Sequence, residues 1–232
     1  MDNAEKNVTI ITDPVAVEAL KVLYENNGPG DLEWNFDIPG QVSATDGSIF
    51  GDNGNLWDLY ISEKGLHGIL TIHGINSLVS ISAWGNAFSG VDLNNLSKLN
   101  YLDLDENEIE SLVVMDNLPV LEFLSLTGNK IKEFTALAGL KSLRKLFLGE
   151  NPLKDISALF ELHPDLFFRM AYPKVNHECG LKCVFRQLQE LNARIITGDE
   201  DNENDLEDSH KQEDIANSLS VLDDGGLNYE EN

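Results

Sequence analysis

Side chains with binding chemistry recur between regularly spaced leucines in the central part of the chain. These aromatic, acidic and basic residues are Asp58, Tyr60, Trp84, Tyr101, Asp103, Asp105, Phe123, Lys145, Phe147 and Arg169. Aromatic side chains supply much of the binding energy at protein interfaces, and carboxylates attract cationic partners. These residue types therefore predict noncovalent binding, not a reaction that makes or breaks covalent bonds.

Patterns typical of catalysis or metal binding are weak in this sequence. It has no glycine loop that cradles phosphates, no G-x-S-x-G and no H-E-x-x-H. Asp103 and Asp105 form a pair of carboxylates, which we interpret as a surface feature of a strand. His177, Cys179 and Cys183 form an H-x-C-x3-C cluster without an evident fourth ligand, so we expect the cysteines to pack as small apolar residues, with a metal or redox role as the alternative. We expect no enzyme activity, no metal and no cofactor.

The leucines between these residues follow a 22-residue period. The first set is Leu118, Leu121, Leu124, Leu126, Asn129, Ile131, Phe134 and Leu137, and the second is Leu140, Leu143, Leu146, Leu148, Asn151, Leu153, Ile156 and Leu159. Leucines that alternate with other residues predict a half-buried strand, and the Asn predicts a turn in which its amide satisfies backbone groups. The later leucines are expected to face inward from a return arm. One coil cannot bury this surface, so several stacked coils are predicted.

The pattern L-x-x-L-x-L-x-x-N-x-L resembles the leucine-rich repeat. This resemblance implies an α/β fold, a curved right-handed solenoid, of the short class seen in phosphatase-1 regulators and acidic nuclear phosphoproteins. Phasing by the Asn position gives about six coils. The first departs from the pattern because Lys64 replaces the Asn, and the sixth is degenerate around Phe168, Met170, Pro173 and Val175.

Stacking of the coils predicts rows of side chains on the concave face, because residues alternate in direction along each strand. The first row is Asp58, Ser80, Tyr101, Phe123, Lys145 and Phe167, the second is Tyr60, Ser82, Asp103, Ser125, Phe147 and Arg169, and the third is Ser62, Trp84, Asp105, Thr127, Gly149 and Ala171. Glu63, Glu106, Glu150 and Tyr172 are expected at the rim. A shift of the strand register by one residue would turn the side chains of these rows toward the core.

The N-terminal part predicts a helix that covers the first coil. Asp13 and Pro14 are typical of an N-cap and a first helical residue, and Gly28 of a helix end. Residues 1–12 are expected to form a loose arm, and residues 35–55 a loop with at most a short strand. The stretch from about 13 to 34 resembles the N-terminal cap of plant-type and bacterial leucine-rich repeat proteins.

The C-terminal part predicts a second amphipathic helix over residues 180–195. Its apolar face would be Leu181, Val184, Phe185, Leu188, Leu191 and Ile195. The stretch from Val184 to Asp201 resembles the C-terminal cap and acidic tail of the acidic leucine-rich nuclear phosphoproteins. The expected divisions are an arm and helical cap over 1–55, the repeats over 56–178, a helical cap over 179–198 and a disordered acidic tail over 199–232. The apolar residues of 215–222 could also form a short docking motif.

The charge of the chain narrows the choice of partner. The formal net charge is −24, and residues 199–232 hold 13 acidic residues and one lysine. Such acidity disfavours direct binding to nucleic acid or to anionic membranes. Two cysteines and the absence of a signal-peptide pattern favour an intracellular protein, cytoplasmic or nuclear, unless a precursor carries a signal peptide. A monomer is expected.

These observations predict a non-catalytic protein-binding module whose concave face holds a basic or mixed-charge segment. Two alternatives remain open. In the first, the acidic tail carries the affinity, and the protein is a regulator or chaperone of basic nuclear proteins. In the second, suggested by the N-terminal resemblance, it is a secreted or surface adhesion protein of the virulence type. Leucine-rich repeats serve unrelated functions, so the repeat alone does not identify the partner.

Overall fold

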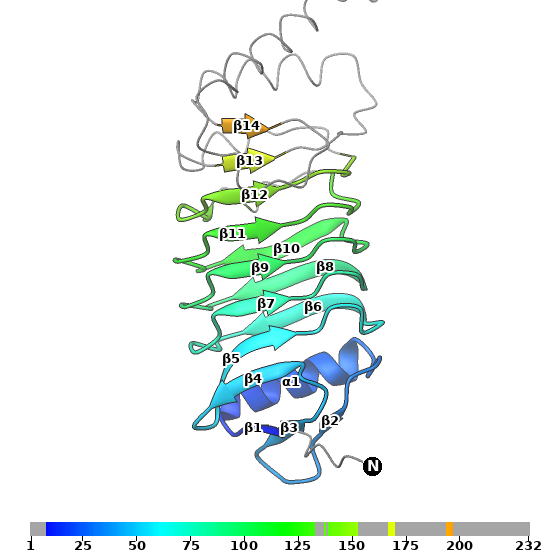
Figure 1. Ribbon diagram of the computed structural model, residues 1–232, viewed down its shortest axis with the longest axis vertical. Helices are drawn as coiled ribbons and strands as arrows, with labels where there is room; N and C mark the ends of the chain where they lie inside the picture. The colour runs from blue at the N-terminus through cyan, green and yellow to red at the C-terminus, as the bar shows by residue number, and fades with distance from the viewer. Residues whose placement is uncertain (1–7, 133–136, 138, 153–166, 170–193, 197–232) are drawn as a thin grey trace, which may run out of the picture.

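The chain winds into coils that stack along one axis (Figure 1). The computed structural model describes residues 8–132, 137, 139–152, 167–169 and 194–196. Within them, each coil contributes one strand to a main sheet, and the earlier coils contribute a second strand to a sheet across the core. The predicted solenoid of stacked coils is confirmed.

The main sheet contains eight strands within the described residues, in the order β14-β13-β12-β11-β9-β7-β5-β4. They are β4 (Ile49–Asp52), β5 (Asn55–Tyr60), β7 (Ser80–Ser82), β9 (Tyr101–Asp103), β11 (Phe123–Ser125), β12 (Lys145–Phe147), β13 (Phe167–Arg169) and β14 (Arg194–Ile196). Neighbouring strands are parallel except for β4 and β5, which pair antiparallel. The outer face of this sheet, predicted to be concave, is called the main-sheet face below.

The return arms of the first three coils are strands, which the sequence analysis did not predict. They are β6 (His67–His73), β8 (Ala87–Asn94) and β10 (Ser111–Asp116). Over the described residues they form a parallel sheet in the order β10-β8-β6. Buried residues alternate with more exposed ones in these arms, as at Leu70 and Ile72 or Val91 and Leu93. This period of two is the signal of a strand.

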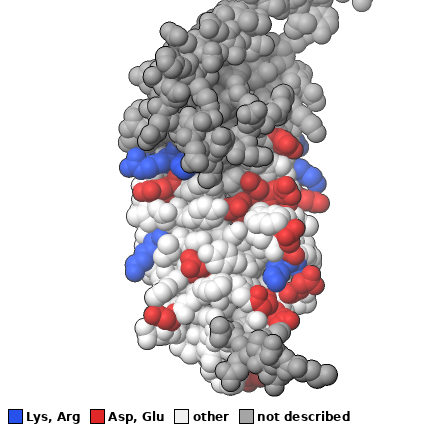
Figure 2. Space-filling view, in the orientation of Figure 1, with Lys and Arg blue, Asp and Glu red and all other residues white. Residues whose placement is uncertain are grey.

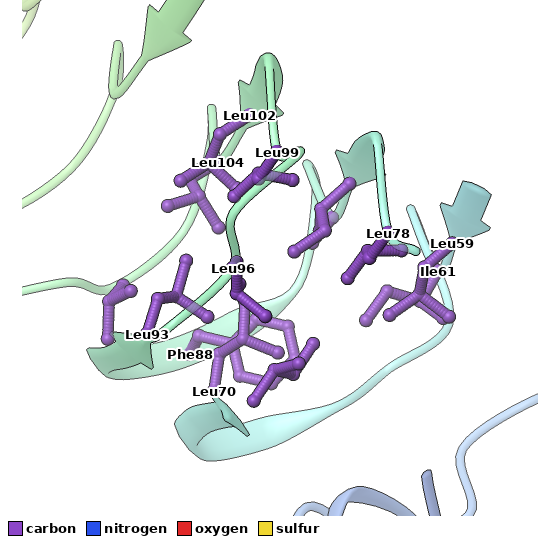
Figure 3. Close-up of a cluster of buried hydrophobic side chains, with 14 of the residues drawn as sticks. Leu59, Ile61, Leu70, Leu78, Phe88, Leu93, Leu96, Leu99, Leu102 and Leu104 are labelled. Carbon is purple, nitrogen blue, oxygen red and sulfur yellow. The ribbon is translucent and has the colours of Figure 1, made fainter. Parts of the chain in front are cut away.

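The core fills the space between the two sheets. Leu59, Leu78 and Leu102 enter it from the main-sheet side, whereas Leu70 and Phe88 enter from the other sheet (Figure 3). All five side chains are fully buried. Burial of a leucine stabilises the fold by about 2 kcal/mol relative to its exposure. The predicted repeat leucines of the described residues are thus core residues.

A column of asparagines joins the coils on the edge of the main sheet. Asn107, Asn129 and Asn151 each donate from Nδ2 to a carbonyl oxygen of the preceding coil and to carbonyl oxygens of their own coil. Each Oδ1 accepts a backbone N–H of the preceding coil, as from Ile109 to Asn129 at 3.0 Å. The repeat requires Asn because only this short amide both donates and accepts here.

The first coil keeps its turn although Lys64 replaces the asparagine. The Oδ1 atom of Asn86 accepts the backbone N–H groups of Lys64 and Leu66, at 3.1 and 3.0 Å. The ammonium of Lys64 lies 3.5 Å from a carboxylate oxygen of Asp46. The N-terminal unit, not another coil, precedes this coil, so Lys64 has a different neighbour from the later asparagines.

The predicted N-terminal helix is present as α1 (Pro14–Asn26). The Asp13 side chain accepts the N–H groups of Val15 and Ala16, and Pro14 begins the helix. Ala16, Leu20 and Leu23 face the core, and α1 contacts β6. The resemblance of this helix to the N-terminal cap of plant-type and bacterial leucine-rich repeat proteins stays a prediction.

Two expectations for the N-terminal part are wrong. Residues 9–11 are not a loose arm but form β1 (Thr9–Ile11), which pairs with β3 (Val42–Ala44); β2 (Trp34–Asn35) pairs with the same strand. Ile11 is fully buried, which explains why this segment is held. Residues 35–55 contain β3 and β4, not a loop with at most one strand.

The predicted C-terminal helix is wrong at its end, because Arg194 and Ile195 lie in β14. Ile195 pairs with Phe168, and two consecutive β-branched isoleucines favour a strand. Residues 180–193, the Cys179 and Cys183 cluster and the tail lie outside the described residues. The strand of the predicted sixth coil coincides with β13, and the rest of that coil also lies outside them.

Candidate protein-binding surface

The main-sheet face presents the predicted rows in the predicted register. Asp58, Ser80, Tyr101, Phe123, Lys145 and Phe167 are successive backbone partners from β5 to β13. Tyr60, Ser82, Asp103, Ser125, Phe147 and Arg169 are partners in the next row. Trp84, Asp105, Thr127 and Gly149 follow in the third, joined by backbone hydrogen bonds between coils. For Arg169 only the backbone position is described.

Three aromatic rings form a ladder across neighbouring coils. The ring centroids of Tyr101 and Phe123 are 4.4 Å apart with an interplanar angle of 13°. Those of Phe123 and Phe147 are 5.3 Å apart and tilted by 41°. All three side chains are half-buried, so the ladder is held on the sheet while part of it meets solvent. We call Tyr101, Phe123 and Phe147 the aromatic ladder.

A second aromatic pair lies at the N-terminal end of the same sheet. The rings of Phe50 and Tyr60 pack edge to face with centroids 5.4 Å apart, and both remain more than two-fifths exposed. Phe50 was not predicted, because residues 35–55 were expected to be a loop with at most a short strand. Asn53 and Gly54, both at positive φ, join β4 to β5 in a two-residue hairpin, and this Asn-Gly pair was the available signal.

A further row, also missed, borders the face on the side where each strand begins. Backbone hydrogen bonds connect its members from coil to coil. They are Trp57, Val79, Asn100, Glu122 and Arg144. Trp57 and Val79 are 44% and 40% exposed, and a backbone hydrogen bond places them on neighbouring coils. Large exposed apolar side chains that adjoin one another are typical of interaction sites.

Three carboxylates lie among these aromatic side chains. The Oδ1 atom of Asp105 accepts the Ser125 hydroxyl at 2.5 Å and the Thr127 backbone N–H at 2.7 Å. Asp103 accepts the backbone N–H of Asp105 at 3.1 Å. Burial raises the pKa of Asp58 and of Asp103, and it raises the pKa of Asp105 to about 6. Burial opposes ionisation because it removes water from the charged form.

No cationic side chain within the described residues pairs with these carboxylates. The ion pairs found there join Lys21 to Glu25, Lys64 to Asp46, His73 to Asp92, Lys130 to Glu108 and Arg144 to Glu122. None of them includes Asp58, Asp103 or Asp105. Figure 2 shows acidic side chains spread over the visible face, with the basic ones toward its margins. Lys145 is exposed beside the aromatic ladder.

The rim has a regular backbone conformation. Glu63, Gly85, Glu106, Gly128 and Glu150 occupy equivalent positions of successive coils and all have φ between 52° and 70°. Glutamate and glycine therefore alternate along the axis. A Cβ atom on Gly85 would lie 2.9 Å from Cγ of Glu63, so each glycine leaves room for the glutamate of the preceding coil. The predicted rim positions of these three glutamates are consistent with this geometry.

The described residues offer no arrangement suited to metal chemistry. No group of three His, Cys, Asp or Glu side chains among them is placed to hold a metal ion. No helix in this part of the chain combines the length and apolarity needed to cross a membrane. The chemistry on the main-sheet face is that of aromatic contact, hydrogen bonding and charge.

A match to a known family model supports the repeat assignment over part of the chain. The family model of two leucine-rich repeats matches residues 119–161. Two internalin structures from Listeria monocytogenes are similar at low identity. The first, internalin inlF, is 18% identical over 64% of this chain and 48% of its own, with a TM-score of 0.39. The second, internalin C2, is 16% identical over 61% and 80%, with a TM-score of 0.30. No curated protein matches the chain significantly, and the chain spans about half of the first internalin structure.

Proposed function

We propose that this chain, a solenoid that contains leucine-rich repeats, is a non-catalytic binding module whose main-sheet face holds a segment of another protein. One observation carries the proposal. The aromatic ladder and the carboxylates of Asp58, Asp103 and Asp105 share one face, and no described cation pairs with those carboxylates.

The chemistry of this face favours a basic or mixed-charge partner. Half-exposed aromatic side chains are the residue type that dominates binding energy at interfaces. Partly buried carboxylates without a cationic neighbour gain most when a partner supplies the positive charge. Solenoids offer such surfaces because each coil adds one strand to an extended face. Binding is therefore expected to weaken as salt concentration rises.

The two alternatives from the sequence concern other features. The acidic-tail regulator depends on residues 199–232, which lie outside the described residues, and it stays a prediction. The adhesion alternative, like the compartment of the protein, depends on whether a precursor carries a signal peptide. Neither competes for the residues of the main-sheet face.

The test is a selection from a random peptide library displayed on phage, with the full chain as bait. A parallel selection uses the Asp58→Asn/Asp103→Asn variant, which removes charge without creating a cavity. A matched control uses Ile69→Ala/Val113→Ala, two exposed residues of the opposite sheet. We expect cationic peptides with apolar residues to be enriched by the wild type and by the control, and not by the charge variant. Equal recovery from all three baits, including no enrichment from any, would contradict the proposal.

A further inference from the structure

The strand β7 differs from its neighbours on the main-sheet face because it contributes small side chains. Ser80 lies between Asp58 of β5 and Tyr101 of β9 in the first row. Ser82 lies between Tyr60 and Asp103 in the second row. Each serine thus separates one carboxylate from one tyrosine, in opposite order in the two rows. We call these six residues the serine step.

The two tyrosines of the serine step are supported from outside it. Phe50 contacts Tyr60 from β4, and Phe123 contacts Tyr101 from β11. Since β4 and β11 lie on the far sides of β5 and β9, both supports come from the side away from β7. The strands β5 and β9 are two strand spacings apart, about 10 Å. Tyr60 and Tyr101 stand in different rows, so the two rings lie diagonally across the small side chains of Ser80 and Ser82.

The charge of the serine step is negative and uncompensated within the described residues. Asp58 and Asp103 stand on opposite sides of the serines, and no described Lys, Arg or His pairs with either. Burial raises the pKa of both carboxyl groups because it removes water from their charged forms. The hydroxyl of Ser82 contacts that of Ser62 at 3.0 Å. The serine step therefore combines hydrogen-bonding oxygens with aromatic walls.

We propose that the serine step binds one arginine side chain of the partner segment. A guanidinium group is flat, stacks on aromatic rings and donates several hydrogen bonds in the plane of its nitrogens. It can therefore stack on a tyrosine ring while it donates hydrogen bonds to a neighbouring carboxylate. A lysine ammonium offers a point charge without a flat surface, so it uses the carboxylates but not the walls. This inference rests on the proposed function and specifies the partner's chemistry.

The position of the aromatic ladder predicts a second residue of the partner segment, besides the arginine. Phe123 lies two strands beyond β7, a distance of about 10 Å, which an extended segment covers in about three residues. The partner segment is therefore an arginine with an apolar residue three positions away, which lies on Phe123 and Phe147. The segment runs along the solenoid axis, across the strands.

The test uses the three tryptophans as reporters. The full chain is labelled with 5-fluorotryptophan, and the signals are assigned with Trp→Phe variants. Trp84 follows Ser82 by two residues, Trp57 lies in the bordering row, and Trp34 is buried in the N-terminal unit as an internal control. The probe peptide carries Arg-Gly-Ser-Leu between neutral flanks. Matched peptides replace the arginine by lysine or by citrulline, which keeps the shape and removes the charge.

We expect the Arg peptide to shift the Trp84 signal saturably while the Trp34 signal stays in place. The Lys peptide should bind about fivefold more weakly, and the citrulline peptide should give no saturation. Asp58→Asn/Asp103→Asn should abolish the shift. Glu110→Gln/Asp116→Asn makes the same change in charge just before β10 and at its last residue, and it should leave the shift intact. Equal affinity for the Arg and Lys peptides, no shift at Trp84, or no effect of the first variant would overturn the assignment.

The two proposals fail in different ways. The library selection could yield peptides that need Asp58 and Asp103 but bind equally well when lysine replaces arginine. That result would support the main-sheet face as the binding surface and contradict the arginine site. If the charge variant and the wild type recover the same peptides, the binding face itself falls. A positive Trp84 titration with the Arg peptide supports both.

Discussion

The rings of Tyr101 and Phe123 lie nearly parallel across two coils, with centroids 4.4 Å apart. They stack because β9 and β11 pair in register, so that residues 22 positions apart become neighbours on one face. On the next strand Lys145 is the backbone partner of Phe123, and Phe147, two residues further on, packs diagonally against the Phe123 ring. The 22-residue period of the sequence therefore determines which side chains are neighbours on the main-sheet face.

A double-mutant cycle measures how strongly this pair is coupled. We expect Tyr101→Ala and Phe123→Ala to show a coupling free energy of about 1 kcal/mol in urea unfolding, because stacked rings contribute beyond their buried area. Tyr60→Ala with Phe123→Ala serves as the control, since Tyr60 lies three strands from Phe123. That pair should be additive within about 0.5 kcal/mol. Coupling of similar size in both cycles would contradict the ladder.

The asparagine column should dominate the stability of the repeats. Asn129 is buried and bridges two coils, donating to Leu104 and Leu126 and accepting from Ile109. Asn129→Ala leaves these buried backbone groups without partners, so we expect the free energy of unfolding to fall by about 2–4 kcal/mol. The control is Asn100→Ala, which removes one hydrogen bond of 3.4 Å and should cost less than about 0.5 kcal/mol. Similar losses for both variants would argue against the column.

The register of the main-sheet strands could be predicted from the sequence because leucines and asparagines recur at fixed positions in each repeat. The leucines that flank Tyr101 and Phe123 fix which residues point outward, and the asparagines fix the phase of each coil. Every pairing predicted for the first and second rows, from β5 to β13, is therefore found. The presence of Lys64 in place of an asparagine does not change this register. Asn86 of the next coil accepts the backbone N–H groups of Lys64 and Leu66 and so holds the turn.

What could not be predicted depends on features outside the repeat. The return-arm strands β6, β8 and β10 alternate with a period of two, but the sequence analysis applied the leucine spacing there instead. The strand β4, and with it Phe50, escaped because a segment rich in Gly, Asp and Asn was taken as a loop. Asn53 and Gly54 form a two-residue turn that predicts a hairpin. This local signal is stronger evidence for strands than the polar composition of the segment is for a loop.

The alternating rim predicts a charge effect that shape alone does not explain. Gly85 has a φ of 68° and faces Glu63, so a side chain here should destabilise the fold by about 1–2 kcal/mol. Gly85→Glu should cost a further amount of about 0.5 kcal/mol compared with Gly85→Gln, because Glu63 and Glu106 flank it. This difference should vanish in about 1 M salt. A difference that persists there would mean that shape, not charge, requires the glycine.

Asp105 predicts a pH dependence with a defined sign. Its pKa is raised from 3.8 to about 6, chiefly by burial, so the folded state holds the proton more tightly than the unfolded state. The contribution of this group to stability therefore decreases as pH rises from about 3.8 to about 6. Asp105→Asn keeps an Oδ1 acceptor for Ser125 and Thr127 and removes the buried charge.

We therefore expect Asp105→Asn to be more stable than the wild type at pH 7.5, by up to about 2–3 kcal/mol. The advantage should shrink as the pH is lowered toward 4, where Asp105 is mostly protonated in the folded state. Urea unfolding of the two proteins at both pH values measures it, and other carboxyl groups cancel in the comparison. A variant that is less stable at pH 7.5, or an advantage that is unchanged at pH 4, would refute the environment assigned to Asp105.

The most direct test of the binding face is a calorimetric titration of one peptide recovered by the wild-type library selection. It is titrated into the full chain, the Phe123→Ala variant and the Ile69→Ala variant, which removes an exposed apolar residue from the opposite sheet. We expect Phe123→Ala to weaken binding by at least about tenfold, Ile69→Ala to leave it unchanged, and salt to weaken the wild-type affinity. Binding that is lost with Ile69→Ala, or that is indifferent to Phe123, would contradict the main-sheet face as the binding surface.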